Sequence, residues 1–153
     1  MNRLEFIAKI QEQRYCVIDF MPQQMSIKDN FSFFNEIELY FLEFRKRIRI
    51  VEQFSNIILK TLCYFDFEVL FGFERATKKE GFVRNCNCME TEIRKVLAGK
   101  ADKITFLLPN EKAMIEILHD QLTIAVYNPS PRVTEIMRSL AISEGLFWWE
   151  PQQ

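Results

Sequence analysis

The chain has 153 residues, of which 48% are hydrophobic, and its formal net charge is −1 at pH 7. This length fits one globular domain over residues 1–153, and the balanced charge disfavours nucleic-acid binding, which needs a basic excess. No stretch approaches the roughly 20 apolar residues that span a bilayer, and residues 1–13 mix charged with apolar side chains, unlike a secretory signal. We therefore expect a soluble, cytoplasmic protein whose core is rich in Phe, since the chain contains fifteen of them.

The N-terminal residues are expected to form a helix and then a strand. Asn2 can cap a helix and Glu5 can reach back to the same turn, which predicts a helix over residues 3–12. Residues 15–20 are a short apolar run that ends before Pro22, and this favours a buried strand. A polar loop should lead from there into the next element.

The segment 31–65 repeats apolar side chains every three and four positions, as an amphipathic helix does. The two apolar rows are Phe34, Phe41, Ile48 and Leu62, and Ile37, Phe44, Val51, Ile58 and Phe65. No Gly or Pro occurs between Pro22 and Gly72, so the backbone allows one continuous central helix, and we expect this segment to dominate the core. A pair of helices with a bend near Glu43–Lys46 fits the same pattern, because the repeat survives a gentle bend.

The middle of the chain predicts a strand, a loop and a helix. Residues 67–73 place aromatic and aliphatic side chains at every second position, which is typical of a strand. Residues 74–86 are polar and favour a loop. Residues 88–98 follow as a helix, with an apolar face, acidic residues in the first turn and Gly99 at the end.

Three short apolar runs come next, and each is expected to be a strand. They cover residues 104–108, 113–118 and 122–127. The connections at 109–112 and at His119–Asp120 are short, so consecutive strands should pair as an antiparallel meander.

The C-terminal part predicts one more helix and one more strand. Ser130 followed by Pro131 is a strong helix start, Gly145 can end the helix, and residues 146–149 can return as a strand. The elements together predict an α+β fold: a mostly antiparallel sheet of about five or six strands, packed against a long central helix or helix pair and two to three shorter helices.

The chain carries no catalytic, nucleotide-binding or strong metal signature. His119 is its single histidine and lies beside Asp120 at an expected hairpin tip, where a solvated turn is a better interpretation than a catalytic base. Cys86 and Cys88 form a C-x-C pair, but the usual zinc spacing and a second ligand pair are missing from the sequence. We expect no metal and no cofactor, and an incidental or redox-sensitive pair of thiols.

Four basic residues lie close together in the long helical region: Arg45, Lys46, Arg47 and Arg49. In a helix, Arg45 and Arg49 stand one turn apart. A solvated helical face is the plainer interpretation of this cluster. The alternative is a patch that binds phosphate or an acidic partner.

Asp19 and Glu116 are each isolated among the apolar residues of an expected strand. Each can point to the solvated face of its strand or pair with an Arg. Brought together in a cavity, the two carboxylates could do acid–base work, with pKa values driven apart. Tyr127 is a third candidate for the lining of such a pocket.

Phe147, Trp148 and Trp149 follow one another on the last expected strand. Consecutive side chains on a strand face opposite sides of a sheet. Unless both faces are covered, one Trp remains at the surface, where it would suit a protein interface. The alternative is that one of the two Trp closes the edge of the core.

By elimination, we expect a small non-enzymatic protein that binds another protein, as immunity proteins and toxin inhibitors do, or that forms a homodimer. The stretches 126–130 and 143–148 resemble segments of small bacterial proteins and point to no particular family. The alternative is a small-molecule-binding protein or enzyme with a Phe- and Tyr-lined pocket oriented by Asp19 or Glu116. Nucleic-acid binding through residues 45–49 is a third hypothesis, which the balanced charge disfavours.

Overall fold

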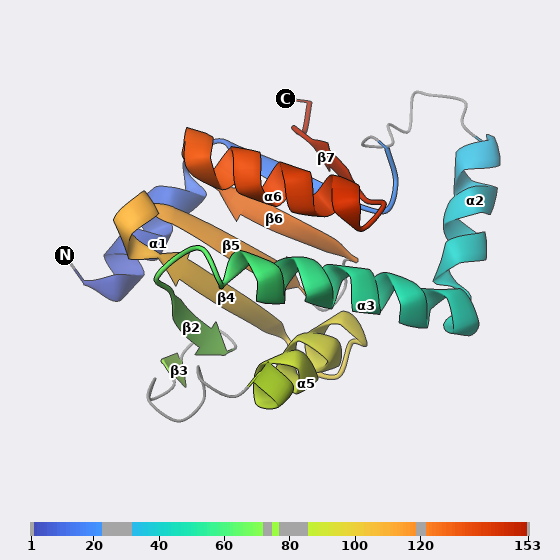
Figure 1. Ribbon diagram of the computed structural model, residues 1–153, viewed down its shortest axis with the longest axis horizontal. Coiled ribbons are helices and arrows are strands. Elements are labelled where there is room, and N and C mark those ends of the chain that lie inside the picture. The colour runs from blue at the N-terminus through green and yellow to red at the C-terminus, as the bar shows by residue number, and fades with distance from the viewer. Residues whose placement is uncertain (1, 23–31, 72–74, 77–85, 119–121, 153) are drawn as a thin grey trace.

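The computed structural model describes residues 2–22, 32–71, 75–76, 86–118 and 122–152, and shows one sheet with helices on both faces (Figure 1). The strands are β1 (Tyr15–Asp19), β2 (Glu68–Phe71), β3 (Arg75–Ala76), β4 (Lys103–Leu108), β5 (Ala113–Leu118), β6 (Thr123–Tyr127) and β7 (Phe147–Trp149). The helices are α1 (Arg3–Gln11), α2 (Ser32–Leu42), α3 (Phe44–Thr61), α5 (Cys86–Leu97) and α6 (Pro131–Ser143). These elements confirm the expected α+β fold.

Every strand pairing among the described residues is antiparallel, in the spatial order β3-β2-β4-β5-β6-β1-β7. The meander of β4, β5 and β6 is confirmed. β1 pairs with β6, and β7 pairs with β1, so the first and last strands lie side by side. The expected loop over 74–86 is wrong in two places, because residues 75–76 pair with β2 and α5 begins at Cys86.

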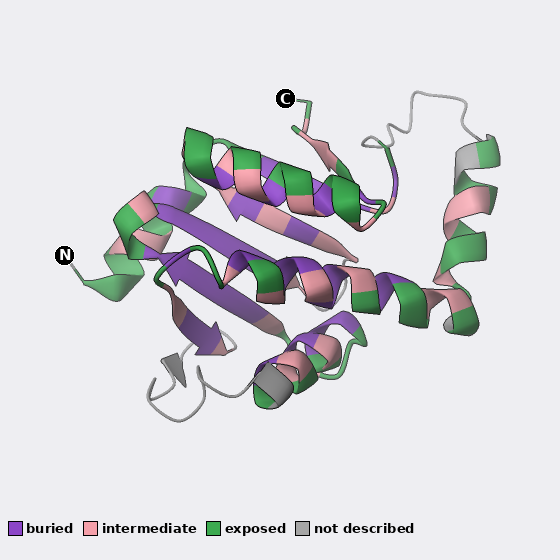
Figure 2. Cartoon of the chain, viewed as in Figure 1, coloured by how far each residue is buried: buried purple, intermediate pink, exposed green. Residues whose placement is uncertain are grey.

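The main core lies between the sheet and the helices α3, α5 and α6, which cover one face (Figure 1). Phe54, Ile57 and Ile58 of α3 are each 0% exposed, so α3 is the central helix of this layer. On the opposite face, Ile10 of α1 packs in a smaller cluster with Leu70, Leu107 and Met114. The alternation of side chains along β4 and β5 therefore places apolar groups on both faces, and Figure 2 shows these two strands buried along most of their length.

The helical region that begins at Ser32 is interrupted at Glu43, whose backbone is extended, with φ −55° and ψ 141°. The two-helix interpretation with a break near Glu43–Lys46 is therefore confirmed. The expectation that the whole segment dominates the core is wrong for α2. Phe41 is 40% exposed, and Figure 2 shows exposed and partly buried positions along the described part of α2. Ile48, in the first turns of α3, is also 50% exposed. Burial of the segment in the core begins at Ile50 of α3. The break directs α2 away from the sheet.

The helix ends follow the local signals in the sequence. Asn2 accepts a hydrogen bond from the Leu4 N–H, and Glu5 accepts one from the Asn2 N–H, so the capping box is formed. Ser130 caps α6 by accepting from the Val133 N–H at 3.2 Å, and Gly145 follows the helix with φ +77°. Within the described ranges, no helix combines the length and apolar character that a membrane crossing requires.

Candidate functional site

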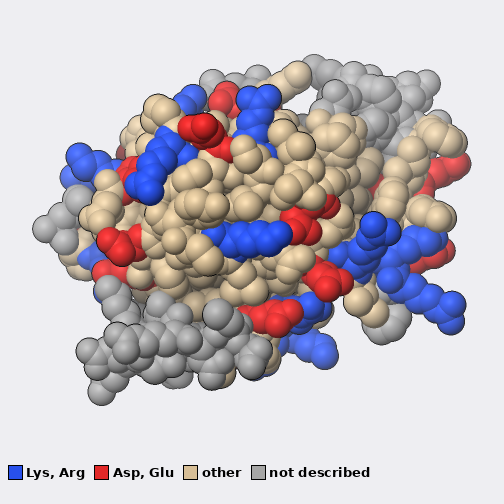
Figure 3. Space-filling model, viewed as in Figure 1, with Lys and Arg blue, Asp and Glu red and all other residues tan. Residues whose placement is uncertain are grey.

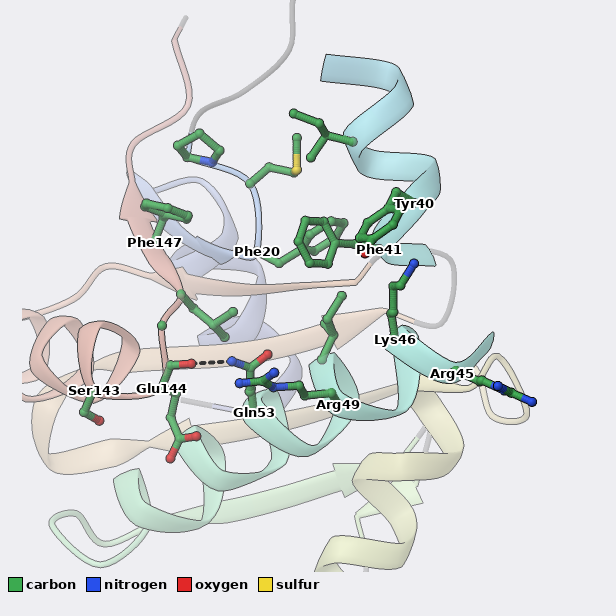
Figure 4. A pocket seen from close by; sticks show the side chains of 16 residues that line it. Phe20, Tyr40, Phe41, Arg45, Lys46, Arg49, Gln53, Ser143, Glu144 and Phe147 are labelled. Carbon is green, nitrogen blue, oxygen red and sulfur yellow. Dashed lines mark hydrogen bonds between the residues drawn. The ribbon is translucent and has the colours of Figure 1, made fainter. Parts of the chain in front are cut away.

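A groove of about 950 Å³ lies where α2, α3, the end of β1 and the α6–β7 connection meet (Figure 4). Its lining consists of Phe20, Met21, Pro22, Ile37, Tyr40, Phe41, Arg45, Lys46, Arg49, Ile50, Gln53 and residues 143–147. In Figure 4, α2 forms one wall, the Phe147 side of β7 the other, and the side of α3 lies between them. The groove exists because α2 leaves the body at Glu43 instead of continuing along the sheet.

One side of the groove is aromatic. Phe41 meets Phe20 edge to face, with ring centroids 6.3 Å apart, and meets Tyr40 in the same geometry at 5.3 Å. Such edge-to-face contacts are favourable beyond the burial of apolar area. These contacts join the base of α2 to the end of β1. Tyr40 nevertheless stays 54% exposed and Phe41 40% exposed, so their rings also offer surface to a ligand.

The part of the groove formed by α3, between the two walls, is basic. Arg45 and Arg49 stand one turn apart on α3 and are both exposed, as their spacing predicts. Lys46 is held in place, since its Nζ lies 3.1 Å from Glu43 Oε2 and 3.0 Å from the centroid of the Tyr40 ring. Arg47 belongs elsewhere, because its Nη2 donates to the Leu97 carbonyl at 3.1 Å, at the end of α5. The predicted cluster of four bases therefore contributes three to the groove.

The α6–β7 connection is fastened to α3 by polar contacts. Gln53 donates through Nε2 to the Glu144 carbonyl, the contact drawn as a dashed line in Figure 4. The Glu144 carboxylate accepts from Lys60 Nζ at 2.8 Å and from Asn56 at 3.4 Å. The positive φ of Gly145 then directs the chain into β7. These contacts place Phe147 at the wall of the groove.

The three aromatic residues of β7 have different environments. Phe147 is 44% exposed and lines the groove. Trp148 is opposite Ile18 on the sheet and packs against the main core, and Trp149 donates through Nε1 to the Met21 carbonyl at 3.2 Å. Both Trp are half-buried, so the exposed aromatic at this edge is the Phe and not a Trp.

Asp19 lies behind the groove and is 9% exposed. Burial raises the pKa of its carboxyl to about 6, against the opposing effect of hydrogen bonds from the backbone N–H groups of Met21 and Phe20, and the nearby charge of Glu38 raises it further. The Met21 N–H lies 3.1 Å from Asp19 Oδ1. Asp19 is not one of the described residues that line the groove, although its neighbours Phe20 and Met21 are.

Glu116 is buried on β5 and forms a polar cluster with the neighbouring strand β4. Its Oε2 lies 3.3 Å from Lys103 Nζ and 3.5 Å from Thr105 Oγ1. The side chains of Lys103 and Glu116 are only 12% and 6% exposed, so the charges are paired within the protein. Glu116 is therefore buried and paired with a Lys, whereas the sequence predicted a solvated carboxylate or a pair with an Arg.

Asp19 and Glu116 lie on the same face of the sheet but do not meet. Glu116 is opposite Ala125 on β6, and Asp19 is opposite Thr123 on the same strand. Two strand spacings and a shift of two residues put their Cα atoms about 12 Å apart. Tyr127 lies near Glu116 and stacks on Tyr15, with ring centroids 5.3 Å apart. Burial raises the pKa of Tyr127, and Glu116 and Tyr15 add to this effect.

The remaining sequence candidates show no reactive arrangement in the part of the chain that the structure describes. His119, Asp120 and the side chain of Cys86 lie outside the described residues. Cys16 is buried, and burial together with Glu150 raises the pKa of its thiol to about 11. Searched over the described residues, the structure has no group of three or more His, Cys, Asp or Glu side chains that could hold a metal ion.

The groove joins two of the sequence candidates that are about a hundred residues apart, namely the basic cluster and Phe147. The aromatic residues Phe20, Tyr40 and Phe41 were missed by the sequence analysis. A signal for them exists in the charge pattern, because residues 32–42 contain acidic but no basic residues, whereas residues 45–49 contain four bases. This change of charge falls at the break between α2 and α3.

Comparisons with known proteins do not assign the chain to a family. No family model, no curated protein and no solved structure matches it.

Proposed function

We propose that this protein acts without catalysis and binds a protein partner in the groove between α2, α3 and β7. The observation that carries the proposal is the pairing of an aromatic wall with three bases in one concave site. A partner that fits this chemistry presents apolar side chains with acidic residues beside them. An amphipathic helix laid in a groove is a common way for proteins to recognise such a segment.

The groove has the residue types that dominate protein interfaces. Aromatic side chains and Arg carry much of the binding energy in such interfaces, particularly where they lie close together. Here Tyr40 and Phe147 are partly exposed on the two walls, and Arg49 lies on α3 beside Gln53 (Figure 4). Long-range attraction by the bases would also accelerate the encounter with an acidic partner.

The polar groups of the groove are suited to binding a partner and not to catalysing a reaction. General acid–base or nucleophilic catalysis needs a titratable group within hydrogen-bond reach of its reaction partner. Of the described residues that line the groove, Glu144 supplies a carboxylate, and that carboxylate accepts from Lys60. The free thiols of Cys16 and Cys63 suit a reducing compartment, which supports a cytoplasmic location.

Site-specific photo-crosslinking tests this function. A photoreactive amino acid replaces Tyr40 in the groove, and in a matched control it replaces Tyr64, which is equally exposed at 53% but lies outside the groove. The proposal predicts protein adducts from position 40 and few from position 64. Equal yields of adducts at the two positions would refute the groove as the binding site.

Charge reversal of the basic side provides a second readout. The double variant Arg45→Glu with Arg49→Glu should lose the position-40 adducts. The control variant Arg138→Glu with Lys100→Glu, which reverses two exposed bases outside the groove, should keep them. Adducts that survive the first pair of substitutions would contradict the role of the bases.

A second candidate function is the binding of a small molecule with an apolar body and an anionic head. The groove volume of about 950 Å³ is within the usual range of ligand sites. The charged groups that would orient a ligand in this groove are Arg45, Lys46 and Arg49, and not the expected carboxylates Asp19 and Glu116. The ligand would therefore be an acid. Native mass spectrometry of the purified protein distinguishes the two functions, because a retained acid of low mass favours the second.

A further inference from the structure

α2 presents an apolar surface that the chain itself leaves in solvent. Phe33 is 71% exposed, Leu39 is 68% exposed and Tyr40 is 54% exposed. Figure 1 shows α2 standing away from the layer of α3, α5 and α6. Exposed apolar surface of this extent on one short helix marks an interaction site.

α2 has two differently oriented sides. Ile37, Tyr40 and Phe41 line the groove. Glu36 and Leu39 are three positions apart, so they are neighbours on another side of the helix, and both are exposed. α2 can therefore be a wall of its own groove and, with its other side, the occupant of a second groove.

The charges of α2 and of the groove are complementary. α2 contains Glu36 and Glu38 and no basic residue, whereas Arg45 and Arg49 lie in the first turns of α3. Figure 3 shows blue side chains gathered where α3 begins, next to α2. Within the described part of this chain, Glu36, Arg45 and Arg49 form no ion pair, while Lys46 is already paired with Glu43.

We infer that the partner held in the groove is a second copy of this chain, whose α2 lies in the groove of the first. The inference deepens the proposed function and rests on it. A two-fold axis makes the contact reciprocal, so each α2 occupies the groove of the other copy and the charge pairing forms twice. The arrangement covers the exposed apolar surface of α2 and Phe147, which one copy alone leaves in water.

The size of the contact is adequate for a dimer. Eleven residues of α2 give a helix about 16 Å long. Covering the exposed parts of Phe33, Leu39, Tyr40, Phe41 and Phe147 in both copies removes on the order of 1,000 Å² from water. Specific interfaces begin at about this area.

A charge-swap experiment tests the dimer, with mass measured by sedimentation equilibrium over a wide range of protein concentration. The acid-reversed variant is Glu36→Lys, and the base-reversed variant is Arg45→Glu with Arg49→Glu. Each variant alone should dimerise at least about tenfold more weakly than the unmodified chain, because like charges face each other twice. Glu135→Lys on α6 is the matched control, since this exposed acid lies outside the groove and should leave dimerisation unchanged.

Mixing the two variants is the decisive step. In the mixed pair, the α2 that carries the Glu36→Lys substitution meets a groove that has become acidic, and the unmodified α2 meets an unmodified groove. The mixture should therefore recover dimers that contain one copy of each variant, and a chain with all three substitutions should dimerise with itself. Failure of the mixture to recover dimers, or a dimer insensitive to every reversal, would overturn the inference.

The outcome separates this inference from the proposed function. A chain that stays monomeric at high concentration, but forms adducts with another protein from position 40, overturns the second-copy inference and leaves the binding groove in place. Adducts from position 40 that consist of two copies of this chain support both. A monomer without adducts at position 40 overturns both.

Discussion

Because Asp19 is buried, protonation of its carboxyl stabilises the folded protein. The pKa of this carboxyl is about 6 in the folded protein, compared with an ordinary value of 3.8. At pH values between these two pKa values, the carboxyl binds a proton more tightly in the folded protein than in the unfolded chain. The contribution of Asp19 is therefore fully present below the lower value, and it is lost as the pH rises through the higher one.

The variant Asp19→Asn should be more stable than the unmodified protein at neutral pH and equally stable in acid. The amide keeps an acceptor for the Met21 N–H but carries no charge. The expected gain in the free energy of unfolding is about 3 kcal/mol above pH 6–7 and near zero below about pH 4. Urea unfolding of both proteins over this pH range measures it. A difference that does not change with pH would show that the charge of Asp19 is not the cause.

Sequence reasoning identified Asp19 and Glu116 as unusual residues but could not give their partners. A carboxylate in an apolar strand can be solvated, paired or catalytic, and the local pattern is the same in each case. Glu116 is paired because β4 places Lys103 and Thr105 within reach of it. The short connection predicts that β4 lies beside β5, but the register that puts Thr105 opposite Glu116 does not follow from the local pattern.

At the scale of the element, the start of α6 shows a local signal acting together with a distant residue. Ser130 Oγ accepts from the Val133 N–H and donates to Glu111 Oε2 at 2.6 Å. Glu111 also pairs with Arg132 at 3.3 Å. The cap therefore joins α6 to the connection between β4 and β5, which the sequence signal did not predict.

Replacing Ser130 with Ala should lower the free energy of unfolding by about 1 kcal/mol or more, since the helix cap and the bond to Glu111 are both removed. Ser139→Ala, at an exposed position of the same helix, should change it by less than about 0.5 kcal/mol. Thermal or urea unfolding of the two variants provides the comparison. Equal effects at the two positions would argue against a role for the cap.

The break between α2 and α3 is the element that sequence reasoning left open. Glu43 has an extended backbone without a Pro or Gly to require it. The apolar rows continue across it, so periodicity alone predicts an uninterrupted stripe. Side chains are more buried after the break than before it, because α3 packs on the sheet. α2 contacts the edge of the protein, near the end of β1.

For the whole molecule, the layer of α3, α5 and α6 on the sheet supplies most of the apolar burial. Ile57 of α3 is 0% exposed within this layer, whereas Ile142 of α6 is 65% exposed. The same side chain thus occurs in two opposite environments on neighbouring helices. These two residues allow the contribution of the core to be measured with one chemical change.

Ile57→Ala should reduce the free energy of unfolding by about 3 kcal/mol, because it removes buried methyl groups and leaves a cavity. Ile142→Ala should change it by no more than about 0.5 kcal/mol. Equilibrium unfolding in urea, with the slope checked for each variant, measures the difference. Comparable losses in the two variants would contradict the assignment of α3 as the central helix.

The sequence by itself determined the types of the elements, the ends of α1 and α6 and the meander of β4, β5 and β6. These features depend on periodicity, capping residues and short connections, all of which act over a few residues. The tertiary structure alone decided that β1 joins β6 and β7 joins β1, that α2 departs from the body, and that Arg49 and Phe147 face one groove. Such features arise from contacts between distant segments, whose free energy depends on register and packing that no local pattern encodes.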